Sequence, residues 1–202
     1  MSQSPGPVHR TTTVAPLGAG VPPCEESLAA YFAAAHGAAL EAQAVAGAVV
    51  VPLEIAGARI DLVFAGTRLL IELMPALRRF DTRSRASADT TVHAWDRHTT
   101  GVTLSPPPRG GAAAGGGERS LHVDGARFRA AILAAEGPAS VMDLQSGEAV
   151  FWVDRAERLR RATPDSPLLT LVHWGLERSS GQTMDASAVR TLLEGGARNA
   201  PR

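Results

Sequence analysis

Two short apolar segments, residues 49–55 and 59–64, flank the tripeptide Ala56-Gly57-Ala58 and restrict this chain to folds that contain a β-hairpin. Both segments are rich in valine and isoleucine, which fit the pleated, half-buried surface of a strand. In the second segment Ile60, Leu62 and Phe64 alternate with Arg59, Asp61 and Val63. A short glycine-containing connection joins antiparallel strands, so we expect a hairpin with one buried face.

Helical periodicity surrounds this hairpin. Residues 25–46 begin with two acidic side chains and carry apolar residues near helical spacing, which predicts a helix that Gly37 could bend or divide. Residues 67–80 predict a second helix, which Pro75 must either kink or begin.

The remaining elements follow from shorter patterns. We predict strands over residues 90–95, 120–123, 140–144 and 149–153, and helices over residues 128–135 and 167–178. Residues 145–148 (QSGE) are typical of a hairpin connection between the last two strands. Ser166 is a suitable N-cap before Pro167 at the first helical position.

Together these elements predict an α+β domain in which a mixed, largely antiparallel sheet with β-hairpins packs against several helices. The sequence divides into a disordered N-terminal arm (1–23), an N-terminal α/β part (24–104), a Pro/Gly-rich linker loop (105–118), a C-terminal α/β part of the same domain (119–194) and a flexible tail (195–202).

Composition excludes several classes of function. The formal net charge is +0, so there is no long-range field to attract nucleic acid or an anionic membrane. The single cysteine, Cys24, cannot form an intrachain disulfide, and no N-terminal segment resembles a signal peptide, so we expect a reducing, cytoplasmic location. The most apolar stretch, residues 28–53, is interrupted by polar side chains, which argues against a membrane span.

The sequence contains no lysine, which bears directly on phosphate chemistry. A phosphate loop needs G-x-x-x-x-G-K-[ST], because its amides wrap the phosphates while the lysine neutralises them. The glycine-rich residues 110–117 place Glu118 where the second glycine belongs, and residues 195–202 contain Pro201 and end before a hydroxyl residue. We therefore predict no phosphate loop and no bound cofactor, and we find none of the common hydrolase, zinc or dinucleotide motifs.

Two histidine-containing segments remain as candidate sites. The run H-A-W-D-R-H offers His93, Asp96 and His98 as metal ligands, with His122 as a further histidine ligand, although a solvated strand end explains the same residues. His173 and Trp174 could form a base beside an aromatic platform, but the helical spacing around them favours core packing.

Four segments taken together resemble one family: TVHAWD (91–96), AVFWV (149–153), PLLTLVHW (167–174) and MDASAV (184–189). Their order and spacing are similar to the region upstream of the phosphate loop in HPr-kinase-like serine kinases, including those of bacterial peptide-natural-product clusters. The resemblance covers roughly residues 48–189. The candidate interaction positions that it implies are the family-matched residues Trp95, Asp96, Trp152, His173, Trp174 and Asp185.

The sequence departs from this family where activity would reside. Asp185 stands where the family has histidine, Ser187 replaces one of its alanines, and thirteen residues follow Val189 where the family has a nucleotide-binding module that uses ATP and Mg²⁺. The resemblance thus implies a truncated kinase-like protein without its P-loop.

We expect a non-catalytic accessory module that binds a peptide, a protein or a separate kinase partner, with exposed tryptophans as anchors where they are not core residues. The alternative is an ATP-dependent serine kinase or phosphotransferase, truncated or completed by a partner chain. A decayed remnant without activity also fits the sequence.

Overall fold

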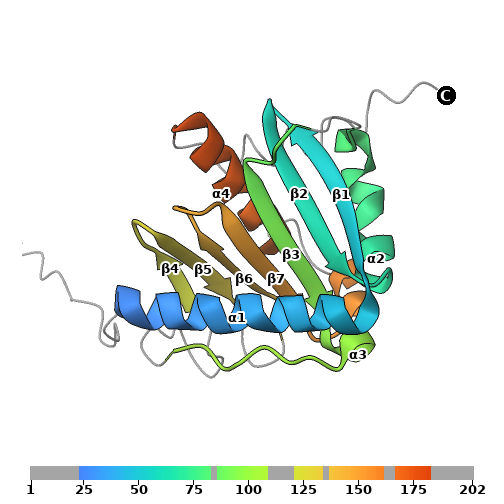
Figure 1. The fold of residues 1–202 in the computed structure, drawn as a ribbon, viewed down its shortest axis with the longest axis horizontal. Helices are drawn as coiled ribbons and strands as arrows, with labels where there is room; N and C mark the ends of the chain where they lie inside the picture. Colours follow the sequence, from blue (N-terminus) through green and yellow to red (C-terminus); the bar gives the residue numbers. More distant parts are fainter. Residues whose placement is uncertain (1–22, 83–85, 109–120, 134–136, 162–166, 183–202) are drawn as a thin grey trace, which may run out of the picture.

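The computed structural model describes residues 23–82, 86–108, 121–133, 137–161 and 167–182, and these form one seven-stranded sheet with helices on both faces (Figure 1). The strands are β1 (Ala48–Ile55), β2 (Ala58–Ala65), β3 (Thr90–Asp96), β4 (Leu121–Asp124), β5 (Phe128–Ile132), β6 (Ala139–Asp143) and β7 (Glu148–Val153). The helices are α1 (Glu25–Ala46), α2 (Arg68–Leu77), α3 (Arg97–Thr100) and α4 (Pro167–Ser180), with short 3₁₀ segments η1 (Arg78–Phe80) and η2 (Ala156–Arg161). The predicted α+β class is confirmed.

The sheet has the order β1-β2-β3-β7-β6-β5-β4. The pairs β2–β3 and β3–β7 are parallel, and the other neighbouring pairs are antiparallel. Because β3 pairs with β7, strands that precede and follow the predicted linker belong to the same sheet. Residues 105–108 of that linker are described without helix or strand, and residues 109–118 lie outside the described residues.

The hairpin of β1 and β2 confirms the prediction for residues 49–64. Ala56 and Gly57 both have positive φ, at 51° and 84°, between the paired residues Ile55 and Ala58. This is the backbone of a two-residue turn whose twist matches the twist of its strands, and glycine adopts it without strain.

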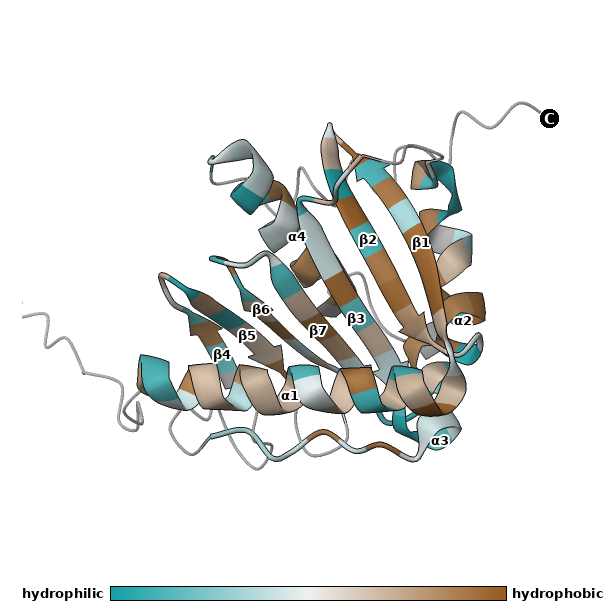
Figure 2. Ribbon diagram, viewed as in Figure 1, coloured by the Kyte–Doolittle hydropathy of each residue, from teal (hydrophilic) through white to brown (hydrophobic). Residues whose placement is uncertain are grey.

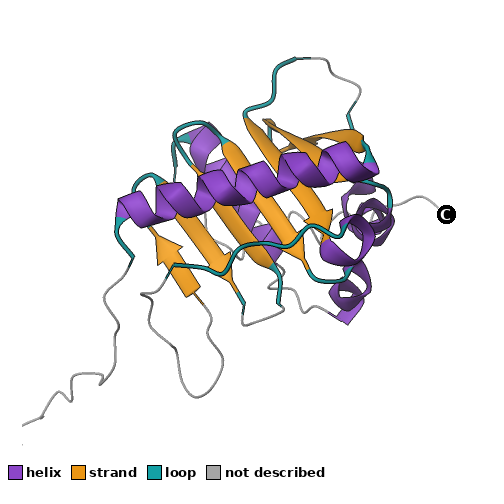
Figure 3. Cartoon of the chain, turned by 60° about the horizontal axis from the view of Figure 1, so that its bottom comes forward, coloured by secondary structure: helices purple, strands orange, loops and turns teal. Residues whose placement is uncertain are grey.

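Helix α1 crosses one face of the sheet, which we call the front face, whereas α2 and α4 cover the opposite back face (Figures 1 and 3). The buried side of α1 is built from Leu28, Tyr31, Ala35, Ala39 and Ala42. The predicted helix over residues 25–46 is confirmed, and Gly37 does not divide it. Figure 1 shows that α1 lies across one end of the strands, and none of the described helices covers the other end of the front face.

The back face holds the larger apolar core. Leu69, Leu73 and Leu77 of α2 and Leu171, Val172 and Trp174 of α4 are buried against it. Pro75 lies inside α2, and the predicted helix over residues 67–80 continues as the 3₁₀ segment η1. Helix α4 confirms the helix predicted over residues 167–178; Ser166, the predicted cap, is outside the described residues.

The predicted helix over residues 128–135 is wrong, because Phe128–Ile132 is the strand β5. Its burial alternates, with Phe128, Ala130 and Ile132 buried and Arg129 and Ala131 less so. Pairing with β4 and β6 on its two sides satisfies its backbone. Alanine-rich composition favours a helix, but two available strand partners outweighed that local preference.

The other predicted strands are found as β3, β4, β6 and β7, with ends shifted by a residue or so. Residues 1–22 of the predicted arm, the predicted tail 195–202 and the family-matched segment 184–189 lie outside the described residues. Among the helices that the structure describes, none combines the length and apolarity needed to cross a bilayer.

Candidate functional site

The tryptophans matched to the kinase-like family are mainly structural. Trp95 on β3 is fully buried and donates its indole N–H to the carbonyl of Val102 over 3.2 Å. Trp174 on α4 belongs to the back core. Both burials agree with the core role that the sequence favoured over exposed anchors. Trp152 on β7 is half-buried, so its ring is the most accessible of the three.

The run H-A-W-D-R-H is dispersed by the fold. The Asp96 carboxylate caps α3 by accepting from the Thr99 backbone N–H at 2.8 Å. His98 lies exposed on α3 itself. His93, three residues before Asp96, projects to the front face instead, so the structure does not bring these three side chains together. His122 is exposed on β4.

The second candidate, His173, is half-buried on α4 and has its Nε2 3.5 Å from the Glu177 carboxylate one turn further on. It lies on the back side of the sheet with Trp174, away from His93. Asp185, matched to the family histidine, is outside the described residues.

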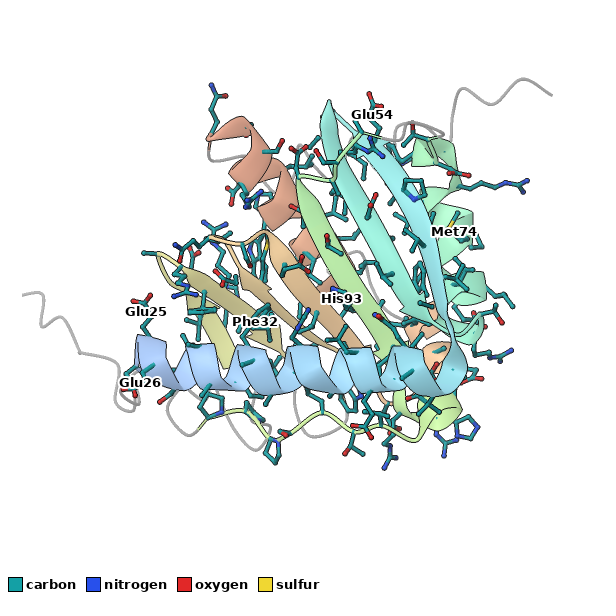
Figure 4. The ribbon with its side chains drawn as sticks, viewed as in Figure 1. Glu25, Glu26, Phe32, Glu54, Met74 and His93 are labelled. Carbon is teal, nitrogen blue, oxygen red and sulfur yellow. The ribbon has the colours of Figure 1, made fainter. Side chains whose placement is uncertain are left out.

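The structure gathers a different polar cluster on the front face, where the flank of α1 meets the sheet. His93 of β3 is only 9% exposed and lies beside α1 (Figure 4). Its Nε2 is 3.0 Å from Oε2 of Glu148 on β7, and its Nδ1 is 2.8 Å from Nε2 of Gln43 on α1. The His36 ring of α1 meets the His93 ring edge-on, with centroids 4.8 Å apart. We call His36, Gln43, His93 and Glu148 the histidine cluster.

The donor and acceptor roles in the two short contacts of His93 depend on its tautomer. When the Gln43 amide donates to Nδ1, that nitrogen is an acceptor and Nε2 carries the proton that it donates to Glu148. Reversing the Gln43 amide would present its oxygen instead and select the other tautomer. The orientation of the Gln43 amide and the tautomer of His93 are therefore coupled.

The environment favours the neutral form of His36. Burial lowers the pKa of His36, the neighbouring His93 lowers it further, and Glu148 opposes both effects without cancelling them. A neutral imidazole offers a lone pair to a proton or to a metal ion. His36, His93 and Glu148 are the described residues whose donor atoms come close enough to share a cation, all within 4.8 Å of one another.

An aromatic contact closes one end of the cluster. Phe32, one turn before His36 on α1, stacks on the His36 ring with the ring centroids 6.0 Å apart. It also contacts Phe128 of β5, with the ring centroids 5.9 Å apart. Figure 4 shows Phe32 on the same helix that passes His93. The cluster is thus bordered by aromatic rings, and its Glu148 side chain stays partly exposed to solvent.

Sequence reasoning singled out His93 and missed its partners. His36 and Gln43 are seven residues apart and so share one side of a helix, which was a usable signal. No pattern in the residues around Glu148 indicated that it would contact His93. Strands β3 and β7 are parallel neighbours, and Val150 of β7 lies opposite His93 of β3. Glu148, two residues before Val150, lies diagonally across from His93 and can therefore reach its ring.

A second surface is the outer edge of β1, which we define as the side of residues 48–51 that faces away from β2. Strand β1 ends the sheet, and Pro52 accepts a hydrogen bond from the Thr82 N–H on this outer side. Since backbone groups alternate along an antiparallel strand, the N–H and C=O of Val50 point outward as well. In the described part of the chain, the outer side of β1 is paired only beyond this edge, where Leu53 forms an isolated bridge with Asp81.

No protein-family model matches this sequence, and the comparisons with curated proteins and with solved structures also give no match.

Proposed function

We propose that this chain is a non-catalytic accessory module of the HPr-kinase-like type that binds another polypeptide, either a peptide or a separate kinase subunit. The outer edge of β1 is the observation that carries this proposal. It offers outward backbone donors and acceptors at one end of the sheet.

The occupant that this edge fits is an extended segment of a partner protein, added as an eighth strand. Residues 48–51 read Ala-Val-Val-Val, with no charged side chain before Glu54, and Figure 2 shows the first half of β1 as hydrophobic. Val50 is 55% exposed, whereas Val49 and Val51 pack against the back core and hold the strand in place. Natural proteins usually protect such an edge with charge, proline or a covering segment, and a partner strand would serve that purpose.

The chemistry of the chain supports binding over autonomous phosphoryl transfer. The sequence contains no lysine to neutralise a triphosphate, and its glycine-rich segment carries Glu118 at the position of a phosphate-loop glycine. The histidine cluster contains one carboxylate, which would repel a phosphate group.

Strand addition can be tested with peptides selected from a random display library against the full chain. The Val50→Pro variant removes an outward N–H without disturbing the pairing with β2, and Val50→Thr retains it as the matched control. We expect Val50→Pro to weaken the selected peptides about tenfold or more, because one backbone hydrogen bond and its neighbours in the added strand are lost.

Peptides methylated at alternate backbone nitrogens provide an internal control. One alternate set should abolish binding and the other should leave it intact, because successive amides of a strand point to opposite sides. Peptides that bind equally well to Val50→Pro, or that tolerate both methylation patterns, would show that the edge is not the binding surface.

Titration of the full chain with Mg-ATP separates the module from the rival kinase. The proposal predicts no heat above dilution, whereas an autonomous kinase must bind the nucleotide. Saturable, magnesium-dependent binding of ATP by the purified chain alone would favour the kinase function.

A further inference from the structure

We propose that His36, His93 and Glu148 form a binding site for a divalent transition-metal ion of the zinc class, held between α1 and the front face of the sheet. This site is independent of the outer edge of β1 and of the function proposed for it. The three residues come from a helix and from two strands that only the folded chain brings together.

The donor set selects the class of metal. Two imidazoles and one carboxylate suit Zn²⁺ and related first-row ions, whereas Mg²⁺ and Ca²⁺ prefer sites made of oxygen donors. A site with three protein ligands leaves a fourth position for water or for a donor from a bound molecule. Glu148 retains 36% of its side-chain exposure, so the site is reachable from solvent.

The distances are compatible with coordination after small rotations of side chains. Tetrahedral zinc with bonds of about 2.1 Å places its ligand atoms about 3.4 Å apart. The donor atoms here lie within 4.8 Å of one another, and Nε2 of His93 and Oε2 of Glu148 are already 3.0 Å apart. His36 and Glu148 are only partly buried, so both can turn inward without moving the backbone.

Gln43 supplies the outer support that metal-bound histidines need. Zinc at Nε2 of His93 replaces the proton that Nε2 otherwise shares with Glu148. The ring then carries its proton on Nδ1, and the Gln43 amide reverses so that its oxygen accepts that N–H. A hydrogen-bonded ligand of this kind fixes the ring orientation and raises its basicity, so Gln43 is a positioning residue.

The test is titration of the full chain with ZnCl₂ by isothermal calorimetry, together with the visible spectrum of the chain loaded with Co²⁺. We expect a single equivalent of zinc to bind with a Kd in the micromolar range or tighter, and Co²⁺ to give the intense visible bands of a tetrahedral complex. The matched controls His98→Gln and Cys24→Ser change exposed potential ligands outside the cluster and should leave the affinity unchanged.

Substitutions within the cluster should act in different directions. His36→Gln and Glu148→Gln each remove a ligand, so each should weaken zinc binding by more than about tenfold. A loss of about tenfold is the smallest effect expected when only an outer-shell partner of a ligand is removed. Gln43→Leu should weaken it about tenfold, and Gln43→Glu should strengthen it, because a carboxylate is the better acceptor for Nδ1–H. The half-exposed Glu148 allows a clear test even if a change at the buried His93 prevents folding.

Three results would overturn the proposal. The first is no zinc binding at all by the folded wild-type chain. The second is binding that persists undiminished in His36→Gln and Glu148→Gln but falls in the His98 or Cys24 controls. The third is an unchanged affinity in both Gln43 variants, which would leave His93 outside the coordination sphere.

Discussion

The two faces of the sheet are covered by helices of different character. The back face is filled by large side chains, among them Leu62, Phe64 and Phe151, packed against leucines of α2 and α4. The front face meets the alanines of α1, which bring that helix close to the strands but bury little apolar surface for each residue. The polar histidine cluster lies beside this thinner layer. The larger apolar core therefore lies on the back face, whereas the metal site that we propose lies on the front face.

The largest expected effect is the loss of stability caused by a cavity in the core of the back face. Leu62→Ala removes a fully buried side chain and should reduce the free energy of unfolding by about 2–5 kcal/mol, since it combines lost burial with a cavity. Urea denaturation followed by circular dichroism measures this loss. The control Ile71→Ala, at an exposed residue of α2, should change stability by less than about 0.5 kcal/mol.

A smaller effect is expected from overpacking the front face. Ala39 is 1% exposed, and Ala39→Leu should cost about 1–3 kcal/mol because α1 must lift from the sheet to admit the larger side chain. Ala34→Leu, on the exposed side of the same helix, is the matched control for helix propensity. Equal stability of the two variants in thermal melts would show that α1 is not closely packed.

A pH-dependent effect should distinguish a buried carboxylate on the front face from an exposed one. Burial of Asp143 works to raise its pKa, but hydrogen bonds from Arg127 and from the Gln145 N–H together lower it below the usual value. The folded chain therefore keeps Asp143 ionised to lower pH than the unfolded chain does. The resulting stabilisation is complete above the unfolded pKa of about 4 and is lost as the pH falls through the folded pKa.

Asp143→Asn tests this dependence. The difference in Tm between wild type and variant should be largest near neutral pH and should shrink below about pH 4. Asp124, which is also beside an arginine but 68% exposed, provides the control Asp124→Asn, whose difference should stay small throughout. A constant difference for Asp143→Asn across the whole pH range would contradict the assignment.

The smallest expected effect is a gain in stability from a substitution in α1, on the front face. Gly37 lies on the exposed side of α1, and an added Cβ would meet no atom within 4 Å. Gly37→Ala should therefore stabilise the chain by about 0.5–1 kcal/mol by favouring the helix. Zinc affinity should remain at the wild-type value, because the substitution leaves His36 in place. A loss of stability would indicate that the helix needs the freedom of glycine at this position.

Local patterns in the sequence were sufficient for much of the fold. The hairpin of β1 and β2 follows from alternation and from the turn at Ala56 and Gly57, and α1 follows from its periodicity. The burial of Trp95 and Trp174 could also be anticipated from their apolar neighbours. These features are decided by residues within a few positions of one another, so a linear sequence contains the information.

The tertiary structure alone decided the rest. Residues 128–132 have the composition of a helix, and they form β5 because strands on both sides satisfy their backbone. His93 was a candidate site residue from the sequence, but its contacts join it to Gln43 and Glu148, which are 50 and 55 positions away in the chain. Such contacts depend on which strands are neighbours and on where α1 crosses them. The same physical reason applies to the outer edge of β1, since a strand is an edge only in relation to the whole sheet.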